Sequence, residues 1–126
     1  MRALLVGIGG GIGSVLRYWL SGALERAVPA TSFPLGTFVV NVAGCLVIGV
    51  LAGLADARGV ITPDARAFLF AGLLGGFTTF SAFALETVNH LKAGSTAVAL
   101  TYVAASVVVG IGAAWLGRAL VTQALR

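Results

Sequence analysis

The chain has 126 residues, of which 59% are hydrophobic and only 10% are charged, and its mean hydropathy is +1.04. Because a soluble domain carries about 25% charged residues, this composition excludes an ordinary soluble protein and indicates an integral membrane protein. The net charge of +4 does not indicate a nucleic-acid partner, since the basic residues form no cluster. With a rise of ~1.5 Å per residue and a hydrocarbon core ~30 Å thick, the length suits one all-α domain, residues 1–126, of about four spans.

Four apolar runs follow one another along the chain and predict four transmembrane helices. They cover residues 3–23, 35–55, 67–91 and 96–121. Short charged or polar segments separate them, namely Glu25 with Arg26, residues 56–66 and residues 92–95. Four spans place both termini on one side of the membrane, together with the 56–66 loop.

The positive charges give a small bias in orientation. The side that holds both termini carries Arg2, Arg58, Arg66, Arg118 and Arg126. The opposite side carries Arg26 and Lys92, to which Arg17 of the first span is added if its side chain snorkels that way. The positive-inside rule then favours cytoplasmic termini, by a margin that leaves insertion in both orientations open.

The first run begins close to Met1, but it is longer than a signal-peptide h-region of about 7–15 residues and contains Arg17, so we expect it to remain as a span. Its glycine-rich start, residues 7–13, fails the G-x-G-x-x-G dinucleotide-binding pattern, because Ile12 occupies the last glycine position and no strand precedes it. Glycines four residues apart indicate close helix packing in lipid instead. These pairs are Gly7 and Gly11, Gly9 and Gly13, Gly49 and Gly53, and Gly72 and Gly76. A four-helix unit this small offers little interior for a pathway, so we also expect oligomerisation.

Few polar residues lie within the runs, and in hydrocarbon each of them needs a partner or a ligand. They are Arg17, Asn41, Thr78, Thr79, Ser81, Glu86, Tyr102 and Ser106. Asn41 is the strongest functional candidate, because its carboxamide carries two N–H donors. Serine and threonine carry less weight, since their hydroxyls can bond back to their own helix. Cys45, the only cysteine, has no disulfide partner within the chain and is interpreted as core filling.

The third run contains the motif GGFTTFSAF, residues 75–83, in its middle. A Gly-Gly pair at mid-membrane depth is tolerated where the loosened backbone is buried in protein or lines a cavity, so the motif predicts a helix broken in mid-membrane. A half-helix ending near Gly75 presents carbonyls that suit a cation, and one starting near Thr79 presents N–H groups. Phe77, Phe80 and Phe83 recur every three residues, and the positive edges of their rings suit a dehydrated anion.

Three motifs in this order resemble the Fluc (CrcB) family of fluoride channels over nearly the whole chain. They are residues 10–18 (GGIGSVLRY), 34–44 (PLGTFVVNVAG) and 75–83. The resemblance implies a fluoride-selective channel of the inner (plasma) membrane, not an enzyme, through which fluoride leaves the cell by passive permeation and its toxicity is reduced. It also implies an antiparallel, dual-topology homodimer with two fluoride pathways at the interface and a structural sodium ion at its centre.

The same resemblance implies a role for each matching residue. Phe80 and Phe83 correspond to an aromatic box whose ring edges face fluoride, and Asn41 corresponds to a donor that lines the pore. The backbone carbonyls of Gly75 and Thr78, from both subunits, are expected to hold sodium. The remaining positions of the polar path are Arg17 at the vestibule, Thr79, Ser81, Tyr102 and Ser106. Ala82 stands where the family commonly has threonine, and the role of Glu86 is left open.

A small multidrug-type antiporter, which exchanges protons for a cationic substrate, is the alternative of the same size and span number. Such transporters resemble one another in an embedded carboxylate of the first span, where this chain has Arg17 and no acid before Glu25. Glu86, the sole embedded carboxylate, lies near the end of the third span, so the channel is favoured. A non-transporting assembly subunit would explain the glycines but not the polar residues of the second and third spans.

Overall fold

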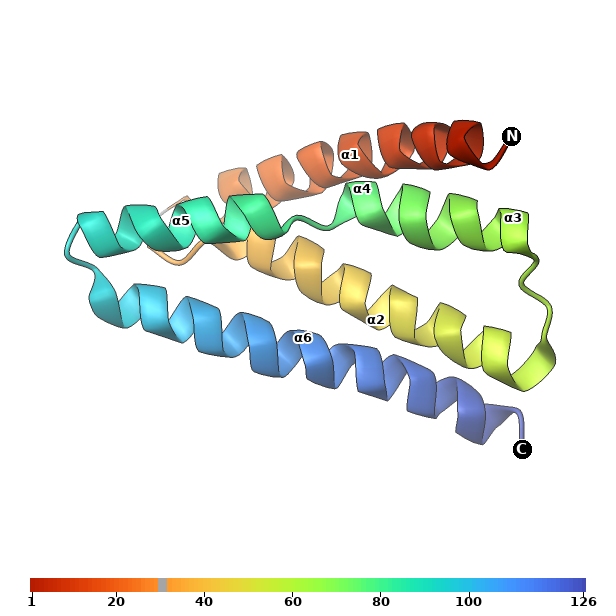
Figure 1. Ribbon diagram of the computed structural model, residues 1–126. Helices are drawn as coiled ribbons and strands as arrows, with labels where there is room; N and C mark the ends of the chain where they lie inside the picture. Colours follow the sequence, from red (N-terminus) through yellow and green to blue (C-terminus); the bar gives the residue numbers. More distant parts are fainter. Residues whose placement is uncertain (30–31) are drawn as a thin grey trace.

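The computed structural model of the protein describes residues 1–29 and 32–126, and these residues form helices joined by short connections, with no strand among them. Four segments are long and apolar enough to cross a membrane: α1 (Arg2–Ala27), α2 (Leu35–Arg58), a composite third segment (Pro63–Lys92) and α6 (Thr96–Ala124). The segments lie side by side, with both termini and the loop between α2 and α3 at the same end of the bundle (Figure 1). The helices extend a few residues beyond the predicted apolar runs, as helices do where they continue from hydrocarbon into the interface.

The third segment is not one regular α-helix. It consists of α3 (Pro63–Arg66), the π-helix η1 (Ala67–Leu74), α4 (Gly75–Phe77) and α5 (Phe80–Lys92). Between α4 and α5, Thr78 and Thr79 have extended backbones with φ/ψ of −83°/158° and −149°/118°. We call this pair the helix interruption. Gly75 and Gly76 themselves are helical, so the first half ends at Phe77, slightly later than the motif indicated.

Local sequence explains where the elements begin and end. Thr62 caps α3 by accepting a hydrogen bond from the Ala65 N–H at 3.2 Å, and Pro63 occupies the first helical position, where its missing N–H costs nothing. Gly59 follows α2 with φ of +60°, and Gly94 turns the chain between α5 and α6 with φ of +78°. Both glycines adopt the left-handed conformation that other residues avoid.

Glycine contacts set the two closest helix pairings, α1 against η1 and α2 against α6. A Cβ added at Gly9 would lie 3.2 Å from the Cα of Gly72, and a Cβ added at Gly117 would lie 3.0 Å from the backbone nitrogen of Val50. Helix backbones therefore touch at these positions, as small residues allow in lipid. The prediction of close packing is not met at Gly7 and Gly11, where an added Cβ would meet nothing within 4 Å.

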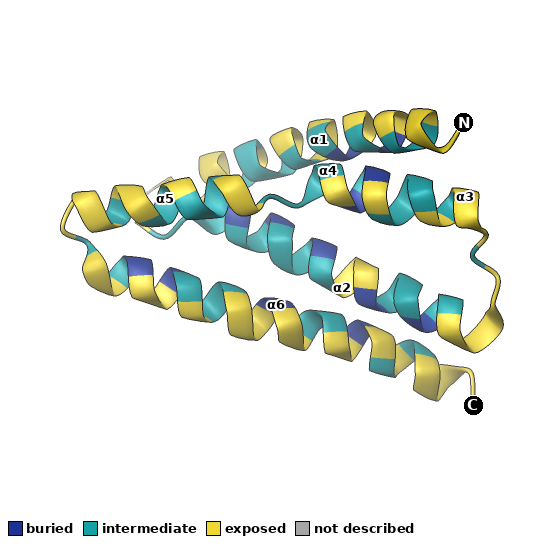
Figure 2. Cartoon of the chain, in the orientation of Figure 1, coloured by how far each residue is buried: buried dark blue, intermediate teal, exposed yellow. Residues whose placement is uncertain are grey.

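The buried core of the single chain is small, and its side chains come from α2, η1 and α6. Val40 and Tyr102 are its fully buried large side chains among the described residues. Within the most apolar stretch of each long segment, only 11–22% of residues are buried, and the outer faces in Figure 2 are mostly exposed. Such an apolar exterior is stable against lipid or against a second copy, but not against water.

Candidate functional site

The helix interruption is held by the side chain of Asn41 on α2. Its Nδ2 donates to the Thr79 carbonyl at 2.9 Å, and its Oδ1 accepts from the Thr79 N–H at 2.8 Å. In a continuous α-helix the Thr79 N–H would donate to the Gly75 carbonyl. Asn41 therefore replaces the helical partner of Thr79 and satisfies both of its backbone groups. The second N–H of the Asn41 amide remains available to another acceptor.

A second hydrogen bond is diverted one turn later. The Ala82 N–H, which a continuous helix would donate to the Thr78 carbonyl, donates to Thr79 Oγ1 at 3.2 Å and so caps α5. The carbonyls of Gly75 and Thr78, which are the predicted cation ligands, have thus both lost their usual helical donors. Among the described residues, no group of three or more His, Cys, Asp or Glu side chains gathers as an alternative metal site.

An open cavity of about 330 Å³ lies beside the interruption. It brings together three predicted pathway residues, Asn41, Thr79 and Phe80, and both predicted cation ligands. Its other lining residues are Gly44, Cys45, Ile48, Phe70 and Leu74. The Phe80 ring is 79% exposed, so its edges are free to face a ligand or a second copy. Cys45, interpreted from the sequence as core filling, is half-buried and lines this cavity.

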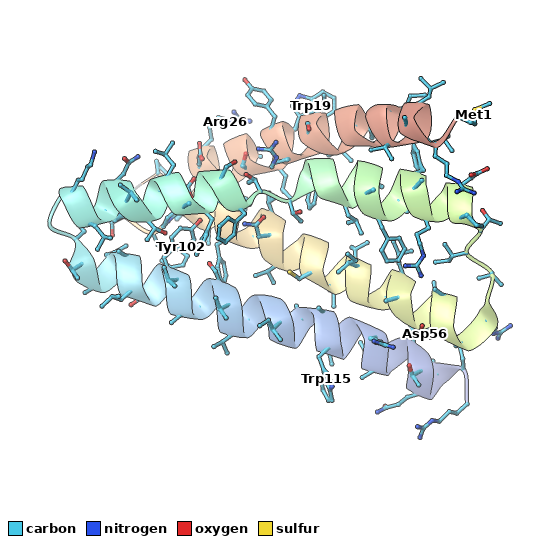
Figure 3. The ribbon with its side chains drawn as sticks, viewed as in Figure 1. Met1, Trp19, Arg26, Asp56, Tyr102 and Trp115 are labelled. Atoms are coloured by element: carbon cyan, nitrogen blue, oxygen red, sulfur yellow. The ribbon has the colours of Figure 1, made fainter. Side chains whose placement is uncertain are left out.

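Aromatic contacts extend from the cavity toward α6. The ring centroids of Phe80 and Phe83 are 5.5 Å apart, and those of Phe83 and Tyr102 are 5.1 Å apart in an edge-to-face arrangement. Tyr102 points from α6 into the space between the helices (Figure 3). Ser81 lies with its Oγ 3.3 Å from Thr79 Oγ1, within hydrogen-bond reach.

Glu86 lies at the end of this aromatic row and is held by two hydroxyls. Thr37 Oγ1 donates to one carboxylate oxygen and the Tyr102 hydroxyl donates to the other, each at 2.7 Å. Sequence reasoning did not place Thr37 in the site. The available signal was the spacing of Thr37 and Asn41, which are one helical turn apart and so share a face of α2.

Two predicted residues lie apart from this row. Arg17 on α1 donates from Nε to the Gly76 carbonyl at 3.2 Å, so its side chain reaches the last turn before the interruption. Ser106 lies one turn after Tyr102 on α6 and is half-buried, and none of the hydrogen bonds found among the described residues joins it to the other candidates.

Comparisons with known proteins find a matching family model and full-length relatives. The family model described as "CrcB-like protein, Camphor Resistance (CrcB)" matches residues 4–118. A protein of Methylobacillus flagellatus named fluoride-specific ion channel FluC is 51% identical over 125 residues, which are 99% of this chain and 98% of the relative. Proteins of the same name from Phocaeicola vulgatus and Nitratidesulfovibrio vulgaris are 48% and 40% identical, over 90% and 92% of this chain and 93% of each relative.

Four apolar segments, the third of them interrupted, with polar groups gathered at the interruption, define a multi-pass membrane protein, which in bacteria resides in the plasma membrane. The family match and the full-length relatives then identify it further. The chain belongs to the CrcB-like family.

Proposed function

We propose that this chain forms a fluoride-selective channel that lets cytoplasmic fluoride leave by passive permeation, without enzymatic chemistry. The names of the full-length relatives support this proposal. The structural observation that carries it is the clustering of Asn41, Thr79 and the exposed Phe80 ring around one cavity at the helix interruption. This combination supplies N–H, O–H and ring-edge groups, all of which are electropositive toward an anion.

The path runs along the row from the cavity to Glu86. Fluoride is small and strongly hydrated, so a selective pore must replace its water with fixed donors. The second N–H of Asn41 and the hydroxyls of Thr79 and Ser81 are the donors at the cavity end. Thr79 Oγ1 already accepts from Ala82, so its own proton is directed either to Ser81 or to a passing anion. The edges of Phe80 and Phe83 follow, with Tyr102 and Ser106 contributing hydroxyls on α6.

The chain works in this proposal as an antiparallel homodimer, with the interruption at mid-membrane depth. One chain leaves a large apolar surface and an open cavity at the site, and a second copy would cover both. The small charge bias between the two ends is compatible with both orientations.

The Gly75 and Thr78 carbonyls of each copy would hold the structural sodium ion. These carbonyl oxygens suit sodium, because they have lost their helical hydrogen bonds and backbone oxygens of this kind can coordinate the ion. When bound, the ion would offset the cost of bringing an anion into a low-dielectric region. Gly75 and Thr78 give two such oxygens per chain, and the second copy of the proposed dimer would double that number.

Halide efflux from liposomes tests the function. Purified protein is reconstituted, and external fluoride and chloride are followed with separate ion-selective electrodes. We expect rapid fluoride loss with chloride retained and no dependence on an imposed proton gradient. Equal loss of both halides, or transport that requires a proton gradient, would contradict the proposal, and the second result would favour the antiporter. Empty liposomes provide the leak control.

A further inference from the structure

The Gly76 carbonyl, in the last turn of helix before the interruption, receives two side-chain donors from α1. Arg17 Nε donates to it at 3.2 Å and Ser14 Oγ lies at 3.4 Å. In a continuous helix this carbonyl would accept from the N–H of Phe80, which lies beyond the interruption and starts α5. The α1 side chains therefore occupy the place of a lost helical hydrogen bond.

The sequence of α1 brings its backbone close enough for this contact. A Cβ added at Gly76 would lie 2.8 Å from the Cα of Gly10, and a Cβ added at Gly13 would lie 2.8 Å from the backbone nitrogen of Phe77. Gly10, Gly13, Ser14 and Arg17 share one face of α1, because they are three or four residues apart. Gly10 and Gly13 let the backbone of α1 touch that of the third segment. The two donors, Ser14 and Arg17, come within about one turn after Gly13.

The charge of Arg17 has no carboxylate partner in the described chain. The two ion pairs found there, Arg2 with Asp64 and Arg118 with Asp56, are exposed and do not include it. A half-buried guanidinium in a membrane span is costly unless other groups compensate it. The compensation comes from the C-terminal end of α4, where helical carbonyls carry a partial negative charge.

We propose that Arg17 is a positioning residue that fixes the helix interruption by a directional hydrogen bond from Nε to the Gly76 carbonyl. Asn41 holds the interruption from α2 through Thr79, and Arg17 holds it from α1 through Gly76. With Gly76 secured on the α1 side, the neighbouring Gly75 and Thr78 carbonyls are left to face the opposite side, where the cavity lies. The hydrogen bond stands on its own geometry, whereas its consequence for sodium and fluoride rests on the proposed function.

Three substitutions separate the hydrogen bond from the charge. Arg17→Gln removes the charge but places an amide nitrogen at the same position along the side chain as Arg17 Nε. Arg17→Met has similar length with neither donor nor charge. Arg17→Lys keeps the charge but has carbon where Nε was. Ser14→Ala, which removes only the longer contact, is the matched control on the same face.

The sequence offers a direct reporter of this carbonyl. Gly76-Phe77 is the only Gly-Phe pair in the chain. Protein labelled with carbonyl-¹³C glycine and ¹⁵N phenylalanine, in nanodiscs, therefore gives a single correlation peak, between the Gly76 carbonyl and the Phe77 N–H. Loss of a hydrogen bond to a carbonyl moves its ¹³C resonance upfield.

We expect the wild type and Arg17→Gln to share one peak position, Ser14→Ala to lie slightly upfield because it loses only the longer hydrogen bond, and Arg17→Met to lie further upfield. An upfield peak in Arg17→Gln, or one position for all variants, would overturn the proposal. If Arg17→Met does not fold, Arg17→Lys takes its place: an upfield peak in Arg17→Lys with the wild-type position in Arg17→Gln supports the proposal, and one position for both overturns it. If Arg17 acts only through its charge, the peak of Arg17→Lys keeps the wild-type position and the peak of Arg17→Gln moves. That result would also overturn the proposal.

Fluoride efflux is measured on the same preparations. Both Arg17→Gln and Arg17→Met lose the charge expected at the vestibule, so their difference reports the hydrogen bond. We expect Arg17→Met to transport roughly tenfold more slowly than Arg17→Gln, as the loss of one well-placed hydrogen bond allows. Equal efflux from Arg17→Gln and Arg17→Met would overturn the link between the carbonyl and the pathway. Absence of efflux from the wild type would instead contradict the proposed function, while the spectra still decide the hydrogen bond.

Discussion

At the scale of single residues, the site separates side chains that fix the backbone from side chains left free to meet a ligand. Asn41 uses one N–H and its side-chain oxygen to hydrogen-bond the backbone of Thr79. Glu86 accepts hydrogen bonds from the hydroxyls of Thr37 and Tyr102. Among the described residues, Phe80 makes one ring contact, to Phe83, and it remains mostly exposed. Substitutions in the first group are therefore expected to alter stability, and substitutions at Phe80 are expected to alter function.

Phe80→Ile tests the second group. Because the ring is 79% exposed in one chain, its removal leaves no cavity in the core, and we expect the thermal midpoint of folding to change little. Fluoride efflux should fall to near the leak rate, because isoleucine has no electropositive ring edge. Leu85→Ile, at a 62% exposed position of the same helix, is the control and should transport normally. Wild-type efflux from Phe80→Ile would remove Phe80 from the pathway.

Glu86→Gln tests the first group. Both carboxylate oxygens accept short hydrogen bonds, and bonds to a charged acceptor contribute about 1.5–3 kcal/mol each against about 0.5–1.5 kcal/mol for neutral ones. The amide also presents a donor to one of two hydroxyls that are already donating, so one of them must turn away. We expect destabilisation by about 1–3 kcal/mol, measured as a lower midpoint of thermal unfolding in detergent.

Glu25→Gln is the matched control, because Glu25 is an exposed carboxylate near the end of α1. Its effect should stay within about 0.5 kcal/mol. Equal midpoints for the two variants would show that the contacts of Thr37 and Tyr102 with Glu86 do not stabilise the chain.

At the scale of elements, sequence patterns predicted the four helical spans and the close packing at three of the four glycine pairs, all but Gly7 with Gly11. The resemblance to the Fluc (CrcB) family predicted that Asn41, Thr79 and Phe80 share a pathway; the three residues line one cavity, and their role in transport stays a prediction. The π-helical register of η1 was not predictable, since residues 67–74 have the composition of an ordinary apolar α-helix. The role of Gly76 was hidden as well, because the donors to its carbonyl come from a helix about 60 residues away in sequence.

The position of the interruption illustrates the same limit. Gly75-Gly76 is the weakest helical pair of the motif by propensity, yet it stays helical. The chain opens at Thr78 and Thr79 because Asn41 accepts the Thr79 N–H and because the Thr79 hydroxyl caps the next helix. Cross-helix hydrogen bonds outweigh local propensity here.

Two glycines on α1 give a matched test of the packing between α1 and the third segment. Gly13→Ala brings a methyl group against the backbone of Leu73 and Phe77, where only backbone movement can relieve it. We expect a cost of about 1–3 kcal/mol in thermal or denaturant unfolding. Gly11→Ala adds the same methyl to an open face of the single chain and should be neutral or stabilising, by up to about 1 kcal/mol of helix propensity. Equal destabilisation by both variants would mean that the open face of α1 is also covered, for example by a second copy.

At the scale of the whole molecule, the apolar exterior and the open site point to the same requirement. Trp19 and Trp115 are 64% and 72% exposed and project from the outer sides of α1 and α6 (Figure 3). Large amphipathic rings of this kind favour the membrane interface. The cavity beside the interruption, by contrast, is lined by the polar residues Asn41, Thr78 and Thr79, and lipid offers no hydrogen-bond partner to polar groups. In the proposed dimer, an antiparallel second copy would cover these groups.

Dual topology gives this arrangement a direct test. In a Cys45→Ser background, single cysteines are placed at Val60, in the exposed loop near the termini, and at Ala93, in the exposed turn at the opposite end. Intact cells are treated with a membrane-impermeant thiol reagent, and lysed cells give the total. Because each copy of an antiparallel pair presents a different end to the outside, we expect both Val60→Cys and Ala93→Cys to be labelled to about half of their totals.

Full labelling of one variant and full protection of the other would mean a single orientation, in which case the carbonyls of Gly75 and Thr78 could not face their copies across an antiparallel interface. Unmodified Cys45→Ser protein provides the background, and its fluoride efflux confirms that the cysteine itself is dispensable.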